Sequence, residues 1–180
     1  MNLSEKQAIM RPQDVVILLK KISRNGRHMN GKQLAASLNI SAAEVSMAME
    51  RNRAAQLVDS TKEHINILSL RDFIIYGLKY CFPTQPGRIV RGIPTASSAS
   101  PIREAIVSNG ESFVWKDSSG SVRGQSITPL FPNVVKTVSE DADLYALLAI
   151  VDSIRIGKSR ERNIAIELLN KYLEDYGLEK

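Results

Sequence analysis

The stretch that decides the fold runs from Asn30 to Val58: Asn-Gly-Lys-Gln-Leu-Ala-Ala-Ser-Leu-Asn-Ile-Ser-Ala-Ala-Glu-Val-Ser-Met-Ala-Met-Glu-Arg-Asn-Arg-Ala-Ala-Gln-Leu-Val. Asn30 can cap a short helix over 31–39, because its side chain can accept the free amide hydrogens of the first turn. The next three residues interrupt the helical spacing, and Ser41 can then cap a second helix over 41–54. The order of these signals predicts two helices joined by a tight turn.

The apolar residues of both expected helices keep a helical spacing, which predicts one inward face for each helix. These residues are Leu34, Ala35 and Leu38 in the first helix, and Val45, Ala48 and Met49 in the second. Glu44 stands three residues after Ser41, which is the spacing of a capping box. Small residues at 35 and 36 allow the two helices to approach closely. The sequence therefore predicts a helix-turn-helix.

The flanking segments extend this unit to a winged helix that ends near residue 82. Pro12 suits the first turn of a preceding helix over 12–24. Short apolar runs at 57–58 and 65–68 surround a polar turn, which predicts two strands of a β-wing. Ser69-Leu70-Arg71-Asp72 has capping-box spacing and predicts a helix over about 70–81.

The segments Ile40–Ser46 and Arg53–Val58, taken in this order, make residues 10–70 similar to MarR-like bacterial transcriptional regulators. Gln56 stands where a glycine usually turns the chain into the wing. The resemblance implies a winged helix that binds double-stranded DNA as a homodimer. A dimer is the usual arrangement because one recognition helix contacts too few base pairs.

The second helix is expected to present an outward face to the major groove. Ser46 can hydrogen-bond a base edge, and Met47 and Ala43 can contact a thymine methyl group. Arg51 and Arg53 suit phosphate contacts. The full set of predicted DNA-binding residues is Lys32, Ser41, Ala43, Ser46, Met47, Glu50, Arg51, Arg53 and Lys62. This face holds few Arg, Asn or Gln residues, so a winged helix that contacts another protein remains the alternative.

Residues 82–101 contain four prolines, two glycines and a Ser/Ala run, which predicts a connector without regular structure. The alternative is an ordered loop, because Ile89, Val90 and Ile93 are interleaved with Arg88 and Arg91. The expected division of the chain is therefore 1–82 (DNA-binding domain), 83–100 (connector) and 101–180 (dimerisation or partner-binding region).

The last part of the chain predicts a short helix over 101–110, a β-hairpin of 113–116 with 121–124, and an αα-hairpin at the end. Apolar residues at helical spacing mark the two final helices: Leu144, Leu147, Leu148, Val151, Ile164, Leu168, Leu169, Tyr172 and Leu173. This much apolar surface needs a third layer, from the same chain or from a second one. The predicted fold class is mostly α with small β-hairpins (α+β).

Composition limits the classes of function. The chain has 180 residues and a net charge of +5, and nine Lys or Arg against five Asp or Glu lie within 1–60, which favours an anionic partner. The absence of a 20-residue apolar run and of an apolar signal core predicts a cytoplasmic protein. Cys81 is the single cysteine and is expected to be a buried, inert thiol. His28 and His64 stand apart and are expected at the surface, so we expect no metal, no cofactor and no enzymatic activity.

A second group of cations surrounds the turn between the last two helices. Arg155, Lys158, Arg160 and Arg162, together with Arg88 and Arg91, are candidate contacts for an acidic protein partner. The main prediction is a sequence-specific DNA-binding regulator that acts as a homodimeric repressor. The alternative is an antitoxin, or a protein-interaction winged helix, that binds an acidic partner through its C-terminal half.

Overall fold

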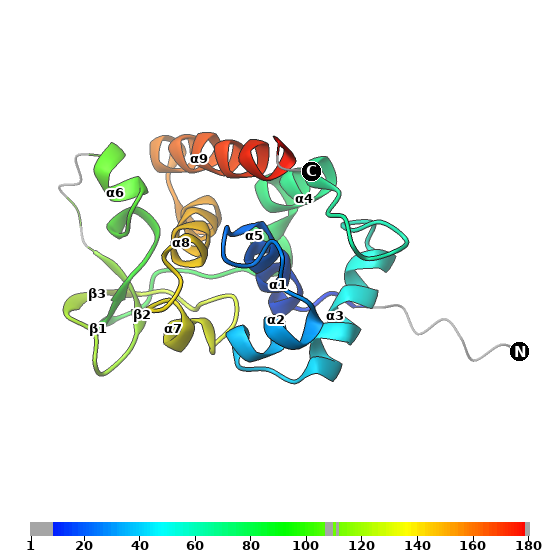
Figure 1. Ribbon diagram of the computed structural model, residues 1–180. Helices are drawn as coiled ribbons and strands as arrows, with labels where there is room; N and C mark the ends of the chain where they lie inside the picture. The colour runs from blue at the N-terminus through cyan, green and yellow to red at the C-terminus, as the bar shows by residue number, and fades with distance from the viewer. Residues whose placement is uncertain (1–8, 107–109, 111, 179–180) are drawn as a thin grey trace, which may run out of the picture.

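The computed structural model describes residues 9–106, 110 and 112–178. The chain is a mostly helical α+β protein with a small three-stranded mixed sheet and a C-terminal pair of helices in contact, as the sequence predicted in outline. Figure 1 shows the strands at one side of the molecule, α2 and α3 at the other, and α8 between them.

The first three helices form the predicted compact unit: α1 (Pro12–Ile22), α2 (Gly31–Leu38) and α3 (Ala42–Ala54). Helix α1 starts at a proline, whose missing amide hydrogen costs nothing in a first turn. Its residues 14–20 are all buried, because α1 contacts α2, α3, α8 and α9. Helix α1 is therefore the central element on which the other helices pack.

The next helix is continuous from residue 67 to 81, but its middle is a wider π-helical turn: α4 (Ile67–Asp72), η1 (Phe73–Gly77) and α5 (Leu78–Cys81). It begins before the predicted capping box, with Asn66 as its N-terminal flanking residue. The prediction that Cys81 is buried is wrong, since this thiol is exposed. The π turn holds an extra residue and so rotates the last turn away from the apolar face that regular α-helical spacing predicted.

The predicted β-hairpin at 113–124 is wrong in its pairing. Strands β2 (Phe113–Lys116) and β3 (Val122–Ser126) run in the same direction, and both pair antiparallel with β1 (Ile89–Pro94). Gly92 of β1 is paired with both Lys116 and Val122, and β2 and β3 also pair with each other in parallel, which closes the small sheet. The turn between them folds back closely on β1, because a Cβ on Gly120 would lie 2.2 Å from backbone atoms of Gly92.

Strand β1 and a short 3-10 turn, η2 (Ala96–Ser98), lie within the segment expected to be a connector. The prediction of no regular structure there is wrong, and the ordered alternative is confirmed. The prolines and glycines led to the wrong prediction because the proline of β1 is its last residue, and Gly92 lies where a Cβ would be 1.9 Å from the carbonyl oxygen of Trp115. Ile93 packs against the core, whereas Ile89 is exposed.

The remaining helices are α6 (Ile102–Ala105), α7 (Val134–Thr137), α8 (Ala142–Ile156) and α9 (Ser159–Leu178). Helix α6 covers part of the predicted 101–110 helix, and residues 107–109 of that prediction lie outside the described residues. Helix α7 was not predicted. Helices α8 and α9 contact each other closely, as the αα-hairpin prediction required.

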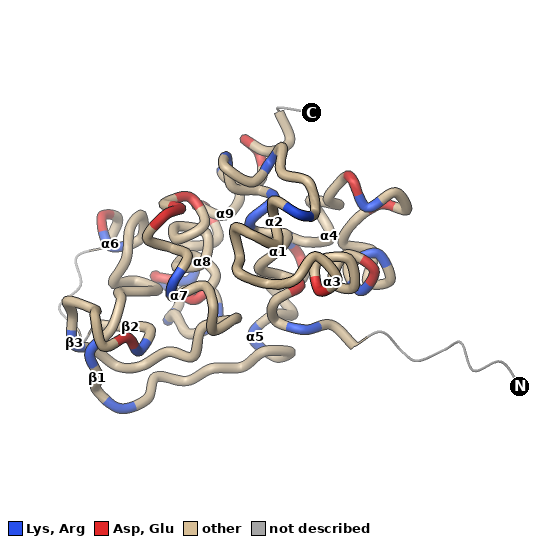
Figure 2. Tube along the Cα trace, turned by 60° about the horizontal axis from the view of Figure 1, so that its bottom comes forward, with Lys and Arg blue, Asp and Glu red and all other residues tan. Residues whose placement is uncertain are grey.

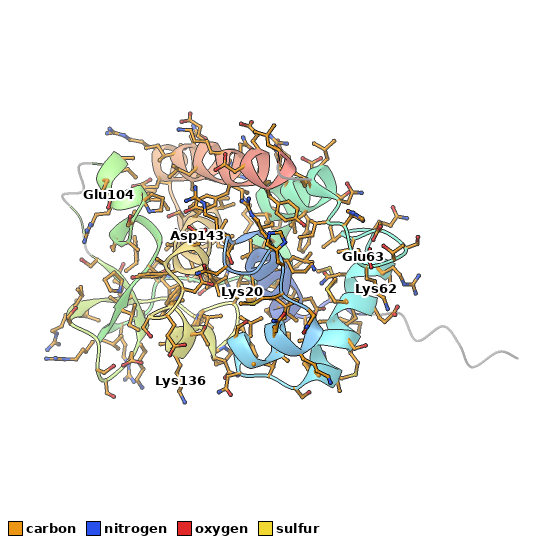
Figure 3. The ribbon with its side chains drawn as sticks, viewed as in Figure 1. Lys20, Lys62, Glu63, Glu104, Lys136 and Asp143 are labelled. Atoms are coloured by element: carbon orange, nitrogen blue, oxygen red, sulfur yellow. The ribbon has the colours of Figure 1, made fainter. Side chains whose placement is uncertain are left out.

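The third layer that this helix pair needs comes from the same chain. One hydrophobic cluster joins α8 and α9 to α1, to α4–α5 and to Trp115 of the sheet. A buried ion pair between Lys20 of α1 and Asp141, the residue that caps α8, adds a polar contact to this junction; Figure 3 shows Lys20 near the centre of the molecule. Among the described residues, no helix is both long and apolar enough to cross a membrane.

Candidate nucleic-acid interface

The helix-turn-helix is held by the local contacts that its sequence predicts. The side chain of Asn30 accepts hydrogen bonds from the amides of Lys32 and Gln33, and so caps α2. Asn39 ends α2 in the left-handed conformation, with φ 52° and ψ 49°, which asparagine tolerates better than most residues. The hydroxyl of Ser41 then accepts a hydrogen bond of 3.1 Å from the amide of Glu44 at the start of α3.

Arg51 does not lie on the outward face of α3, where the sequence analysis expected it. Its guanidinium donates two hydrogen bonds to the carboxylate of Asp14, at 2.7 and 2.8 Å, and a third to Glu44 at 3.1 Å. Hydrogen bonding to Asp14 raises the pKa of Arg51. Because the Asp14 side chain is fully buried, Arg51 neutralises an internal charge and is not available to a phosphate.

The same contacts change the role of Glu44. Its amide is capped by Ser41, but its carboxylate turns toward Arg51 and Gln13 and does not complete a capping box. Glu44 and Arg51 therefore join α3 to the first turn of α1. This network fixes the angle at which α3 sits on the rest of the molecule.

The outward face of α3 is made of small or flexible side chains. Ser41, Ala43 and Ser46 are exposed, and Met47 is 49% exposed. Lys32, at the start of α2, is exposed beside them. A hollow of 610 Å³ lies between the start of α2 and the exposed side of α3, and Lys32, Ser46 and Lys62 are among the residues that line it.

The C-terminal part of this face carries paired charges. The carboxylate of Glu50 accepts hydrogen bonds from the ammonium of Lys62 and, at 2.9 Å, from the guanidinium of Arg53. These two cations hold the pKa of Glu50 below its usual value, Lys62 more than Arg53. Figure 2 shows the acidic and basic residues side by side at α3. Arg53 and Lys62, which are both among the predicted DNA-binding residues, are therefore engaged by one carboxylate in the free protein.

The wing is shorter than predicted, since its two expected strands make only an isolated bridge between Val58 and Ile65. The side chain of Asp59 holds the turn by accepting hydrogen bonds from Thr61 and from the amides of Glu63 and His64. These hydrogen bonds lower the pKa of Asp59 to about 2, and the bond from Thr61 has the largest effect. The turn places Lys62 next to α3 (Figure 3).

Gln56 enters the wing with φ 60°, a left-handed conformation that favours glycine. The glutamine side chain therefore does not prevent the turn into the wing. The carbonyl of Gln56 accepts a hydrogen bond of 3.3 Å from Asn66, which fixes the other end of the wing.

The predicted partner-binding residues divide into two groups. Arg155 is buried: it donates to the carbonyl oxygens of Phe82 and Thr128 and to the carboxylate of Asp152. Arg162 donates to the carbonyl oxygen of Ile75 at 2.6 Å. These two arginines hold the fold together and are not placed for an external partner. The others, which are Arg88, Arg91, Lys158 and Arg160, are exposed.

Both histidines are exposed, and His64 lies 3.2 Å from the carboxylate of Asp59. Within the described part of the chain, no group of three or more His, Cys, Asp or Glu side chains is placed to hold a metal ion. No protein-family model matches this chain, and no curated protein or solved structure matches it either. The resemblance to MarR-like regulators therefore stays a prediction.

The sequence did not indicate the contacts between distant segments. Asp14 stands where an acidic residue is common, in the first turn of a helix, but nothing in the sequence indicates that Arg51, 37 residues away, is its partner. The sequence also contains no indication of a pocket at the junction of α8 and α9, in which the Ser153 hydroxyl is buried without a hydrogen-bond partner among the described residues.

Proposed function

We propose that this protein is a sequence-specific DNA-binding regulator that inserts α3 into the major groove. The observation that carries the proposal is the exposed face of α3 in a helix-turn-helix whose turn is three residues long. Ser41, Ala43 and Ser46 project little from the helix, so the α3 backbone can approach base edges closely. The same arrangement of a recognition helix beyond a short turn is the one that enters the groove in helix-turn-helix proteins.

Each residue of this face has a role in the proposal. Ser46 hydrogen-bonds a base edge, and Met47 packs against a thymine methyl group. Lys32 contacts the phosphate backbone, because it is exposed at the start of α2. Arg51 takes no part, since Asp14 holds it.

Arg53 and Lys62 contact phosphates only after they leave Glu50. In the free protein the Glu50 carboxylate competes with a phosphate for both cations. This competition lowers non-specific affinity, which depends mainly on cation–phosphate contacts. Discrimination between sequences then rests on Ser46 and Met47.

We propose a homodimer, but not through the C-terminal helix pair, whose apolar face is buried within the chain. Leu68, Tyr76 and Tyr80 are exposed along α4–α5, at spacings of eight and four residues. In a regular α-helix a four-residue step drifts by about 40° around the axis. The wider π turn at 73–77 reduces this drift between Leu68 and Tyr76, so we place the three side chains on one side of the helix.

Two charged residues of this helix favour a second copy of the chain as the partner that covers these three side chains. Asp72 and Lys79 lie seven residues apart on this helix, so an antiparallel, two-fold pairing centred between them places each opposite the other residue of the second copy. A two-fold pair of α3 helices would contact half-sites about 34–36 Å apart. Light scattering tests the pairing: we expect a dimer for the natural chain and a monomer for Tyr76→Glu. A natural chain that is monomeric at tens of micromolar would exclude the homodimer.

Binding itself is tested by selecting duplexes from a randomised DNA pool and measuring affinity for the selected sequence over a salt series. We expect one enriched motif and a falling affinity as salt increases. A mobility-shift assay with the DNA upstream of the protein's own reading frame then tests repression of its own gene. If no motif is enriched and no duplex binds at low salt, the protein-interaction alternative replaces this proposal.

A further inference from the structure

A pocket of 540 Å³ lies at the junction of α8 and α9, on the side of the molecule away from α3. Figure 1 shows the start of α9 above the strands, and α3 at the far side. The lining includes Ser97 after β1, Phe113 of β2, Ser153 of α8 and Glu161 of α9. Its volume is in the range of pockets that hold small organic molecules.

Two polar atoms of this lining have no hydrogen-bond partner. Ser153 is 1% exposed, and its hydroxyl is unpaired in the described structure. The Oε2 atom of Glu161 is also buried and unpaired. A buried polar atom without a partner destabilises the free protein, so two of them in one pocket indicate a ligand that supplies the missing hydrogen bonds.

The start of α9 supplies the opposite charge to the same pocket. Helix α9 has 20 residues, and its first amides have no acceptor within the helix, which makes this end attractive to an anion. Lys158 and Arg160 line the pocket beside it, and neither makes an ion pair with another described residue. The pocket therefore has an anion-attracting end and, at Glu161, a carboxylate that needs a donor.

We propose that this pocket binds a small zwitterion, of which free apolar amino acids are the simplest examples. The ligand carboxylate lies at the start of α9 with Lys158 and Arg160. The ligand ammonium donates hydrogen bonds to Glu161 and Ser153. Phe113, together with Ile106 and Ile156, provides apolar walls for the ligand side chain.

The charges of the pocket favour a zwitterion over two simpler ligands. A phosphate would be repelled by the Glu161 carboxylate, and a simple carboxylic acid would leave Glu161 and Ser153 unpaired. Ala96, which also lines the pocket, is buried with φ 50°, a strained conformation for a residue other than glycine. Strain of this kind is common at binding sites, and it is consistent with the proposal.

Isothermal titration of the full chain with L-leucine and L-phenylalanine tests the ligand class. 4-Methylpentanoate lacks the amine of leucine, isopentylamine lacks its carboxylate, and inorganic phosphate tests for a simple anion site. We expect at least one of the two amino acids to bind, and the corresponding one-charge analogues to bind at least about tenfold more weakly. Binding of phosphate alone, or no binding of either amino acid up to about 10 mM, would overturn the proposal.

Two variants test the roles of Ser153 and Glu161. We expect them to leave the stability of the free protein unchanged or higher, but to weaken ligand binding. Ser153→Ala removes an unpaired hydroxyl and Glu161→Gln removes the charge of a carboxylate with a buried, unpaired oxygen, so we expect the melting temperature of the free protein to stay the same or rise. We expect each to weaken amino-acid binding by about tenfold. Lys171→Ala, an exposed change on the same helix, is the matched control.

Equal affinity in Glu161→Gln and the natural chain would contradict the proposal, whether or not Ser153→Ala folds. These measurements are independent of DNA binding, because the pocket shares no lining residue with the exposed face of α3. The proposed ligand and the proposed DNA binding are therefore tested separately, and one can fail without the other.

Discussion

The carboxylate of Asp14 accepts two hydrogen bonds from the guanidinium of Arg51, at 2.7 and 2.8 Å. Asp14 lies in the first turn of α1 and Arg51 in the last turn of α3. The pair joins the helix proposed to contact DNA to the central helix of the core. It removes one cation from the surface proposed to contact DNA and gives that surface a fixed orientation.

Arg51→Ala should lower the free energy of unfolding by about 3–5 kcal/mol, because it leaves the buried Asp14 carboxylate without its counter-charge. Urea denaturation measures this loss. Arg53→Ala is the control, since Arg53 is half-exposed and its pair with Glu50 is worth at most about 1 kcal/mol. Similar losses for the two variants would show that the Asp14 pair has no special role.

Glu50→Gln should tighten DNA binding. The change removes a negative charge from the proposed interface and frees Arg53 and Lys62 for phosphates. We expect an increase in affinity of several-fold at low salt, and a log–log salt slope that is steeper by about one to two units. Fluorescence anisotropy over a salt series measures both. The control is Glu174→Gln, an equal change of charge at an exposed position of α9; the same increase in both variants would point to net charge alone.

Arg155→Ala should destabilise the fold by about 3–5 kcal/mol at neutral pH, because Asp152 is buried and would lose its counter-charge. Burial already raises the pKa of Asp152 above the ordinary 3.8, and Arg155 opposes this rise. A raised pKa in the folded state means that stability is lost as the pH rises through that value. As the pH falls, Asp152 of the variant becomes protonated and loses its charge. The variant should therefore regain stability in acid, above the pH range in which other carboxylates become protonated.

This pH dependence is measured by urea denaturation between pH 4 and pH 7. The natural chain and Arg155→Ala are compared at each pH. Arg160→Ala, an exposed change at the start of α9, should shift the free energy of unfolding by no more than about 0.5 kcal/mol. A pH-independent loss in Arg155→Ala would mean that lost packing, and not the Asp152 charge, determines the effect.

Trypsin should not cut after Arg91 in the native protein. The residue lies within β1, where it pairs with Arg123 of β3, and a protease needs an extended, accessible segment. Limited proteolysis with mass spectrometry should give this cut only in step with global unfolding. Early cleavage after Arg91 would instead support the connector that the composition of residues 83–100 predicted.

Local signals in the sequence were sufficient for the helix-turn-helix and for the final helix pair. Asn30 and Ser41 cap the helices that they were predicted to cap, because capping depends on residues only two or three positions away. Gly157 follows the end of α8 for a similarly local reason. These parts of the fold required no knowledge of distant contacts.

The parts that could not be predicted depend on residues far apart in the chain. Arg51 looked like a surface cation because its partner belongs to another helix. Arg155 looked like an exposed residue of a helix end, but it binds carbonyl oxygens of Phe82 and Thr128. The turn between β2 and β3 packs on β1 through a close approach of two glycines that lie 28 residues apart, Gly92 and Gly120.

The central claim is that the exposed face of α3 binds DNA, and a pair of matched variants tests it most directly. Met47 and Ile89 are similarly exposed apolar residues, at 49% and 53%, on α3 and on β1 respectively. Met47→Glu and Ile89→Glu change the net charge equally, but only the first places a carboxylate in the proposed groove contact. Anisotropy with the selected duplex should give a loss of about 100-fold or more for Met47→Glu, as expected for a charge buried against DNA, and little change for Ile89→Glu. Equal affinities for the two variants would contradict the assignment of α3 as the recognition helix.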